Sequence, residues 1–356
     1  MFILLLLGVG AVKAVETTDR VVLSELTVEP GGSGEAVLTV SLEGSLKYTA
    51  YQMSFVLPEG LEVSVTDGYY DVYMSGTSGF YPQRGNAHSL GANVVDGVLN
   101  VACFSSNNAE FSKTSGELFS IILKASPYLK PGVAPITVKG VRLVTVDEVK
   151  FEPVDYESAA VEVGTTSSLE LKVSATNKFG TCILPFDYAL PADGSLTAYA
   201  CSEHTDDALV LSRVDALRAY TPYILHSDNG FSATISGTVD PAKYPAEGIV
   251  KSGHLVGAVV PNILTEGSYV MQNQGAGTMF YRVGATPFSL AAGKCYVEMP
   301  AGVSAASFRL GTTTSIDDVQ QTAGNAKSIY NVLGQKVDKV SAGHIYIVDG
   351  KKMIAE

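Results

Sequence analysis

The sequence predicts an all-β fold: two antiparallel β-sandwich domains of the jelly-roll or immunoglobulin-like kind, followed by a short C-terminal β-hairpin tail. Three observations predict it. Short runs alternate apolar and polar residues, which is the period of a strand with one buried face. Glycine, proline, asparagine or aspartate separates most of these runs. No stretch shows a helical stripe long enough to compete, and with 46% hydrophobic and 17% charged residues the chain can bury substantial cores.

The chain begins with an apolar run, Phe2–Val12, that is followed closely by Ala14. The run is shorter than the roughly 20 residues that span a bilayer, and small residues such as Val12 and Ala14 suit a cleavage site. Residues 1–14 are therefore predicted to be a signal peptide outside the fold, with the mature chain beginning near Val15. A buried N-terminal strand is the alternative.

The predicted first domain, residues 17–163, consists of strands throughout. In Ala36–Leu42 the even positions are apolar, and in Tyr51–Leu57 the odd positions are apolar until a proline ends the run. Asp96-Gly97 lies between two apolar pairs and predicts a type I′ hairpin turn. The same alternation recurs in Phe119–Leu123, Val141–Thr145 and Val161–Val163.

Two stretches of small residues, Gly164–Ser168 and Gly311–Ser315, predict linkers. They bound a predicted second β-sandwich domain at residues 169–311, in which Leu169–Val173 alternates with the period of a strand. A further hairpin is predicted from Tyr220–Leu225 through Asn229-Gly230 into Phe231–Ile235.

The predicted tail, residues 316–356, contains two short hairpin signals. One surrounds Leu333-Gly334-Gln335 and the other surrounds Asp349-Gly350. With Ile329-Tyr330-Asn331 ahead of the first turn, this segment resembles the type IX secretion-like sorting tails of secreted surface proteins from Gram-negative anaerobes. The resemblance implies export to the cell surface.

Charge and cysteine usage exclude several classes of protein. A net charge of −12 and a pI near 4.9 argue against a nucleic-acid partner, because phosphate binding needs a basic face. Nothing beyond the N-terminal run approaches a transmembrane helix. The five histidines show no metal-binding spacing. The sequence contains no CxxC pair, so a zinc site is not predicted. No metal or cofactor is predicted. Unpaired burial is the preferred interpretation, with disulfides left open, for Cys103, Cys182, Cys201 and Cys295.

No catalytic residue is predicted. Cys201 and His204 are three residues apart and would point to opposite faces of one strand, so that only a turn could pair them. Carboxylate pairs occur, but a sequence does not show whether two of them face each other across a cleft. The chain is therefore interpreted as a non-enzymatic protein, with a hydrolase as the distant alternative.

The stretch Asp67–His88 places several aromatic residues among glycine, serine and asparagine. Exposed rings are costly unless they pack or recognise a partner, and sugar rings stack on aromatic faces. The alternative is that these rings cover the edge of the sandwich. The candidate ligand-binding residues are Tyr69, Tyr70, Tyr73, Phe80, Tyr81 and Arg84.

The first domain resembles the cohesin-like sandwiches of multidomain surface proteins. The residues that carry the resemblance are Phe55-x-Leu57-Pro58-x-Gly60, Phe104–Ser106 and Gly116–Leu118. It implies a jelly-roll-like sandwich with a non-catalytic binding role, in cohesins proper through one sheet face to a partner's dockerin. The chain has no dockerin calcium loop of its own, so a dockerin partner would be another molecule.

The second domain is similar to a C-terminal β-domain that recurs ahead of such tails, a family without a defined activity. Leu184–Asp187, Ala219–Leu225, Gly267–Gln272 and Ala292–Val297 carry this similarity. The sequence as a whole predicts a secreted or cell-surface adhesion or scaffolding protein whose cohesin-like sandwich binds a protein partner. The alternative is a polysaccharide-binding surface protein that uses the aromatic loop at residues 67–88.

Overall fold

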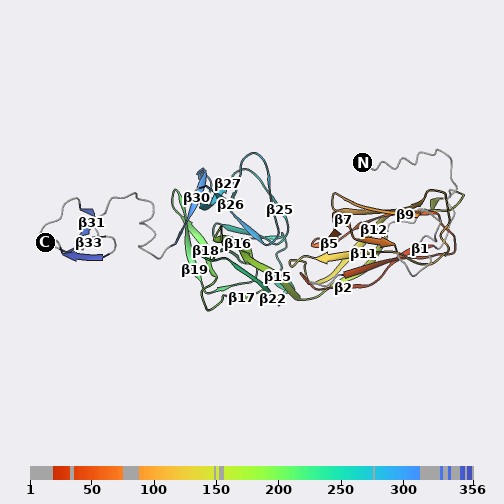
Figure 1. Ribbon diagram of the computed structural model, residues 1–356, viewed down its shortest axis with the longest axis horizontal. Helices are drawn as coiled ribbons and strands as arrows, with labels where there is room; N and C mark the ends of the chain where they lie inside the picture. Colours follow the sequence, from red (N-terminus) through yellow and green to blue (C-terminus); the bar gives the residue numbers. More distant parts are fainter. Residues whose placement is uncertain are drawn as a thin grey trace.

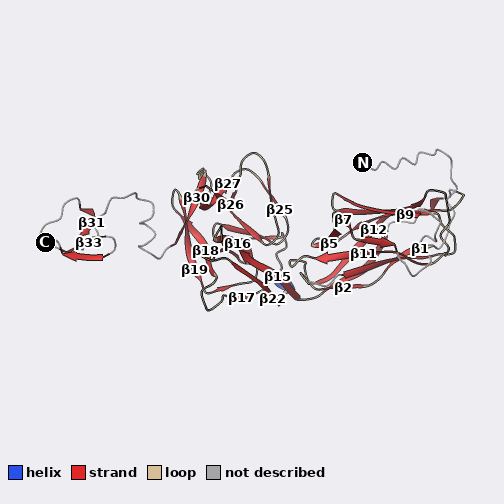
Figure 2. Ribbon diagram, viewed as in Figure 1, coloured by secondary structure: helices blue, strands red, loops and turns tan. Residues whose placement is uncertain are grey.

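The computed structural model describes most of the chain, and the described part is all β (Figures 1 and 2). One 3₁₀ turn, Pro241–Lys243, is the helical element within this part. The expected signal peptide lies outside the described residues. The structure describes residues 19–32, 36–74, 88–147, 150–151, 156–275, 277–312, 329–331, 336–337, 345–348 and 351–354.

A five-stranded sheet forms one layer of the first unit. Its strands β3 and β11 pair antiparallel, and β5 and β8 share the outer edge of β11, each pairing with a different half of that strand. The strands are β1 (Arg20–Leu23), β3 (Ala36–Glu43), β11 (Gly116–Ala125), β5 (Leu61–Val63) and β8 (Val72–Met74). A small hairpin between β5 and β8 is formed by β6 (Val65–Thr66) and β7 (Tyr69–Tyr70).

A seven-stranded sheet forms the other layer, in the order β2-β14-β12-β4-β10-β9, with β13 beside β12. Its ladders are antiparallel except for β2 and β14, which run parallel. The strands are β2 (Leu26–Val28), β14 (Tyr156–Val163), β12 (Gly132–Val144), β13 (Lys150–Phe151), β4 (Ala50–Val56), β10 (Val98–Ser105) and β9 (His88–Val95).

The predicted alternation is confirmed in both layers. Leu38 and Val40 of β3 are fully buried, and so are Met53 and Phe55 of β4 on the facing sheet. The intervening side chains of these strands point to solvent, since successive side chains of a strand alternate between faces. The two sheets therefore enclose one continuous core that is drawn from β-strands of the first unit and the loops between them.

The hairpin predicted at Asp96-Gly97 is also confirmed. Val95 pairs with Val98, and both turn residues have positive φ, 50° for the aspartate and 77° for the glycine. Positive φ at both central residues defines the type I′ turn.

The second unit is built on a ten-stranded sheet that rolls up on itself. Strands near its two ends contact each other and contribute to one core cluster. The strand order is β16 (Phe179–Ile183), β21 (Pro222–His226), β18 (Thr197–His204), β19 (Ala208–Val214), β30 (Ser307–Thr312), β27 (Gly277–Arg282), β26 (Tyr269–Gln274), β29 (Lys294–Val297), β24 (Leu255–Ala258) and β23 (Ile249–Ser252).

Three smaller strand pairs cover this rolled sheet. Within the rolled sheet, β19 and β30 run parallel, whereas its other ladders are antiparallel. The three covering pairs are β15 (Thr166–Val173) with β22 (Phe231–Thr238), β17 (Tyr188–Ala189) with β20 (Ala216–Leu217), and β25 (Asn262–Leu264) with β28 (Phe288–Leu290).

The hairpin predicted through Asn229-Gly230 is wrong. Gly230 does turn the chain, with φ of 82°, but β21 pairs with β16 and β18, whereas β22 pairs with β15. Asn229 does not adopt positive φ, so the type I′ geometry that joins adjacent strands is not formed. The turn instead carries the chain from one sheet to another.

Most described residues of the two predicted linkers are strand residues. Thr166–Ser168 begin β15, and Gly311 and Thr312 end β30. Threonine favours extended backbone, and a ladder to β22 or β19 satisfies its backbone groups. Residues 313–315 lie outside the described part. Gly164 and Thr165 are thus what separates β14 from β15.

The tail contains a four-stranded sheet in the order β32-β31-β33-β34. Ile329 pairs with Val337 in one hairpin, and Val348 pairs with Lys351 in the other, which confirms both predicted strand pairings. The turn residues between them lie outside the described part. The strands are β31 (Ile329–Asn331), β32 (Lys336–Val337), β33 (Ile345–Val348) and β34 (Lys351–Ile354).

The two units meet at a contact that we call the junction, formed by Pro127 and Tyr128 of the first unit against the second. The Tyr128 ring packs against a core cluster of the second unit, and its hydroxyl donates to the Ile183 carbonyl at 2.9 Å. In return, the Tyr244 hydroxyl donates to the Tyr128 carbonyl at 3.1 Å, and Ser167 Oγ donates to the Pro127 carbonyl at 2.8 Å. The units are therefore joined by packing as well as by the chain.

Candidate functional site

The outer side of the seven-stranded sheet is a regular surface of the first unit. We call it the open face and define it by the outward side chains of β9, β10, β4 and β12. Strand pairing aligns them in rows across the sheet, because directly paired residues share a face. The rows are Val95–Val98–Val56–Thr137, Asn93–Asn100–Ser54–Lys139, Gly91–Ala102–Gln52–Arg142 and, at the end, Ser89–Phe104 with Val144–Ala50.

The open face mixes apolar contact area with hydrogen-bonding groups. Its first row is mostly valine, and Phe104 exposes 40% of its surface near the other end. Between them, Ser54 Oγ donates to Asn100 Oδ1 at 2.7 Å, which fixes both side chains on the sheet. The open face therefore offers both apolar contact area and ordered hydrogen-bonding groups.

Two cations reach the open face through a bulge in β12. Lys139 pairs with Ser54 and Arg142 pairs with Gln52, although three positions separate the two cations along the chain. The register shifts between them at Gly140, whose φ is +58°. Without the bulge the two side chains would point to opposite faces. None of the outward positions in the four rows is acidic, whereas β14, on the far side of β12, places Glu157 opposite Thr137.

The aromatic segment divides into exposed and packed rings. Tyr69, on the β6–β7 hairpin, is 78% exposed, and Tyr73 on β8 is 54% exposed. Tyr70 instead packs against the core, as the alternative interpretation had it for some of these rings. Phe80, Tyr81 and Arg84 lie outside the described residues. A ligand-binding role for this set therefore stays a prediction.

A carboxylate holds Tyr73 in place. Asp71 is buried, and its carboxylate accepts hydrogen bonds from the Tyr73 hydroxyl at 2.7 Å and from Thr66 Oγ1 at 2.9 Å. Hydrogen bonds from Tyr73, Ser64 and Thr66 lower the pKa of this carboxyl group, because they favour its ionised form. The exposed ring is thus fixed by a buried acceptor.

Two histidines that the sequence left scattered come together in the second unit. His204 Nδ1 and His254 Nε2 are 3.1 Å apart, and the rings meet edge to face. Burial, followed by the neighbouring His204, lowers the pKa of His254. Their positions, separated by 50 residues, offered no signal. The contact forms because His254 lies in the turn between β23 and β24, where its backbone N–H donates to the Cys201 carbonyl of β18 at 2.8 Å.

The cysteines, which were the remaining candidates for chemistry, are part of the packed structure. Cys201 lies in the core of the rolled sheet, where burial raises the pKa of its thiol to about 12. A register shift follows it in β18, and its Sγ donates to the Glu203 carbonyl, not to an imidazole. All four cysteines are buried and free. Within the described residues no three His, Cys, Asp or Glu side chains gather as a metal site would need.

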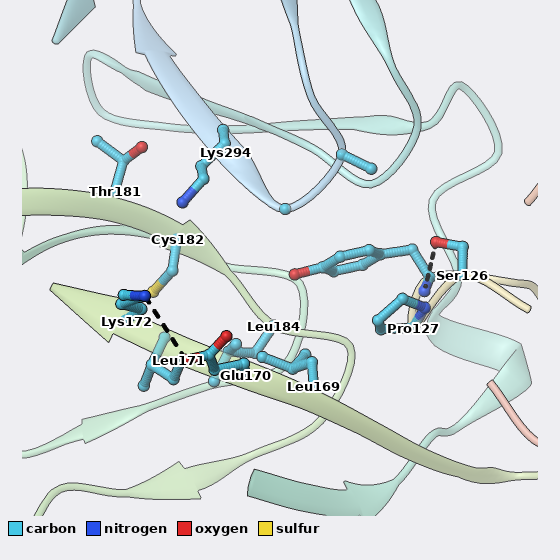
Figure 3. A pocket seen from close by; sticks show the side chains of 13 residues that line it. Ser126, Pro127, Leu169, Glu170, Leu171, Lys172, Thr181, Cys182, Leu184 and Lys294 are labelled. Carbon is cyan, nitrogen blue, oxygen red and sulfur yellow. Dashed lines mark hydrogen bonds and ion pairs between the residues drawn. The ribbon is translucent and has the colours of Figure 1, made fainter. Parts of the chain in front are cut away.

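One cavity, of about 270 Å³, lies beside the junction (Figure 3). Tyr128 lines it from the first unit, and β15 and the loop before β29 line it from the second. The cavity also contains Cys182, but burial raises the pKa of this thiol to about 12, so that it stays protonated at neutral pH. Among the lining residues, Lys172 Nζ lies 4.0 Å from Glu170 Oε1. The cavity therefore offers space but no activated group.

Comparisons with known proteins give the following similarities. No protein-family model and no curated protein matches the chain. Among solved structures, a cohesin from a type I cohesin–dockerin complex of Clostridium thermocellum is 19% identical, with 41% of this chain and 99% of that chain covered and a TM-score of 0.34. A non-cellulosomal cohesin from Archaeoglobus fulgidus is 14% identical, covering 41% and 90%, with a TM-score of 0.31. A type II cohesin from Bacteroides cellulosolvens is 15% identical, covering 40% and 97%, with a TM-score of 0.32.

The described part of the chain contains no helix long and apolar enough to cross a membrane.

Proposed function

We propose that the protein is a non-catalytic adhesion or scaffolding protein of the extracellular space or cell surface, and that the open face binds a protein partner. The observation that carries the proposal is the partly apolar surface of four hydrogen-bonded strands, on which Lys139 and Arg142 share one face. Its backbone is fixed by the ladders, so little conformational entropy is lost when a partner binds. The cohesin-like sequence resemblance supports the same role.

The charge of the open face defines the kind of partner. Lys139 and Arg142 lie side by side at one edge, while valines and Phe104 supply apolar contacts. A partner with acidic groups opposite the two cations would be steered onto this face, and apolar contacts would slow its release. A dockerin is the class of partner that the resemblance implies, and it would come from another molecule.

Charge reversal tests the open face. The mature chain is used to capture partners from the native cell envelope, alongside the double variant Lys139→Glu and Arg142→Glu. We expect a partner that wild type captures reproducibly and that the double variant loses, because the reversed charges repel acidic groups. The matched control is Lys124→Glu, which changes an exposed lysine on the opposite sheet. Equal capture by all three proteins would remove the open face as the site.

Export is the other part of the proposal. The apolar N-terminal run and the resemblance of the tail to sorting signals support it. Mass spectrometry of the secreted or surface fraction should give a mature N-terminus near Val15. An extracellular protein that still begins at Met1 would contradict the signal peptide.

A further inference from the structure

We propose that the outer side of the five-stranded sheet, on the opposite side of the sandwich from the open face, is a second binding surface, and that its ligand is a neutral polysaccharide chain. Its centre is Tyr73. The proposal goes beyond the protein-binding role, because it assigns a different ligand class to a different sheet.

The Tyr73 ring has the properties of a fixed platform. It is 54% exposed, yet its hydroxyl is held by the buried carboxylate of Asp71 at 2.7 Å. Thr66 donates to the other oxygen of the same carboxylate, which fixes the acceptor in turn. A ring that is immobile before binding loses little entropy when a flat ligand stacks on it.

A row of hydroxyl groups extends from this ring across the sheet. Tyr73 pairs with Ser120 on β11, and Ser120 pairs with Thr39 on β3. Ser24 follows, since its backbone N–H donates to the Thr39 carbonyl and its Oγ accepts from the Thr39 N–H. We call these four residues the hydroxyl row. Strands lie about 4.8 Å apart, so the row spans roughly 14 Å.

The surroundings of the hydroxyl row favour a neutral sugar chain over a charged or peptidic ligand. The adjacent row pairs Ile122 with Val37, which is 45% exposed, so apolar area lies beside the hydroxyls. None of the four residues of the row is charged; on β11 the nearest charged residues that share its face are Glu117 and Lys124, in rows to either side. Sugars present the same combination of apolar C–H faces and neutral hydroxyls. A charged ligand would find no counter-charge in the row.

Calorimetric titration with defined sugars tests the proposal. The mature chain is titrated with cellohexaose, xylohexaose and mannohexaose, which are neutral, and with hexagalacturonic acid, which is anionic. We expect saturable binding to at least one neutral hexasaccharide and weaker binding to the anionic one. Absence of saturable binding to all three neutral sugars, or a preference for the anionic sugar, would overturn the proposal.

Variants then locate the site. Tyr73→Ala should weaken binding of the neutral sugar at least about tenfold, as removal of an interface anchor does. Thr39→Val keeps a β-branched side chain in the strand but removes one hydroxyl, and it should weaken binding severalfold with an unchanged melting temperature. The second variant keeps the proposal testable if the first one alters folding. Full affinity in both variants would overturn it.

A matched control separates the two surfaces. Phe104→Ala removes an exposed ring from the open face and should leave sugar affinity unchanged, whereas Tyr73→Ala should leave protein capture unchanged. Loss of sugar binding in Phe104→Ala would place the sugar on the open face and overturn the proposal. Failure of protein capture by wild type would leave the sugar measurements unaffected.

Discussion

The contact between His204 and His254 makes stability depend on pH. The pKa of His254 is lowered in the folded protein by burial and by His204, and burial also lowers the pKa of His88. In the unfolded chain these histidines have a pKa of about 6.5. As the pH drops through this value, the unfolded chain therefore takes up protons before the folded chain does. Folding stability must therefore fall as the pH drops through this range.

Chemical denaturation at pH 7.5 and pH 5.5 should show lower stability of the wild type at pH 5.5. His254→Asn should lose less over the same interval, with the remaining decrease due to His88. Carboxyl groups of lowered pKa, such as Asp71, contribute only at more acidic pH. If wild type and variant lost the same free energy of unfolding between the two pH values, His254 would not be the titrating group.

Adjacent tyrosines of the aromatic segment should respond differently to truncation. Tyr69→Ala should change the free energy of unfolding by less than about 0.5 kcal/mol, as exposed substitutions do. Tyr70→Ala should cost more, because Tyr70 packs against the core, yet less than the roughly 3–5 kcal/mol expected for fully buried Phe55→Ala. Equilibrium unfolding of the three variants checks this order, and a reversed order would contradict the assignment of the rings.

At the scale of single elements, strands could be predicted better than their partners. Alternation identified β3 and β4 because burial of one face is a local property of the sequence. Pairing is not local. Asp96-Gly97 joins β9 to β10, whereas Gly230 turns the chain toward β15, which begins more than 50 residues earlier. The pairing of β22 with β15 depended on which strand lay beside β22 in the folded chain.

The bulge of β12 explains why the open face could not be predicted from spacing. Lys139 and Arg142 share a face only because the strand register shifts at Gly140. Simple alternation places two residues of odd separation on opposite faces. A glycine between Lys139 and Val141, within an alternating run, was the available signal, and it does not specify which residues a bulge brings together. The exposed Tyr69 and Tyr73, by contrast, were among the residues that composition had already singled out.

A glycine pair tests the bulge. Gly140→Ala should destabilise the protein by about 1 kcal/mol, because φ of +58° is costly for a residue with a Cβ. It should also weaken partner capture at the open face, since Lys139 and Arg142 shift. Gly91→Ala is the control: Gly91 lies on β9 of the same face, without positive φ and with open space around a Cβ. Equal stability of both variants in urea would contradict a structural role for the bulge.

At the scale of the whole molecule, the junction couples two units that each have a core. The first core is drawn from residues between Val21 and Val163. We therefore still expect fragment 17–163 to melt cooperatively. Fragment 169–311 lacks Tyr128, which packs against its core, and also lacks Thr166–Ser168 of β15 and Thr312 of β30, so it should be less stable than the same unit in the full chain.

Scanning calorimetry of Tyr128→Ala tests the coupling. The wild type should show one transition or two closely overlapping ones, and the variant should show two separated transitions, with the second unit melting at lower temperature. Lys113→Ala is the control, because it changes an exposed lysine of the first unit that is not among the junction residues. Identical thermograms for Tyr128→Ala and wild type would mean that the units fold independently.

The two parallel strand pairs have a mechanical consequence. β14 leads out of the first unit beside β2, and β30 leads out of the second beside β19. A pull on the C-terminal end of either strand acts along its axis, while its ladder hydrogen bonds lie across that direction. These bonds share the load and break together, whereas the bonds of a hairpin pulled apart at its open end break one after another. A partner held on the first unit and an anchor beyond β30 would load both exits in this resistant geometry, so the chain is arranged to bear tension between them.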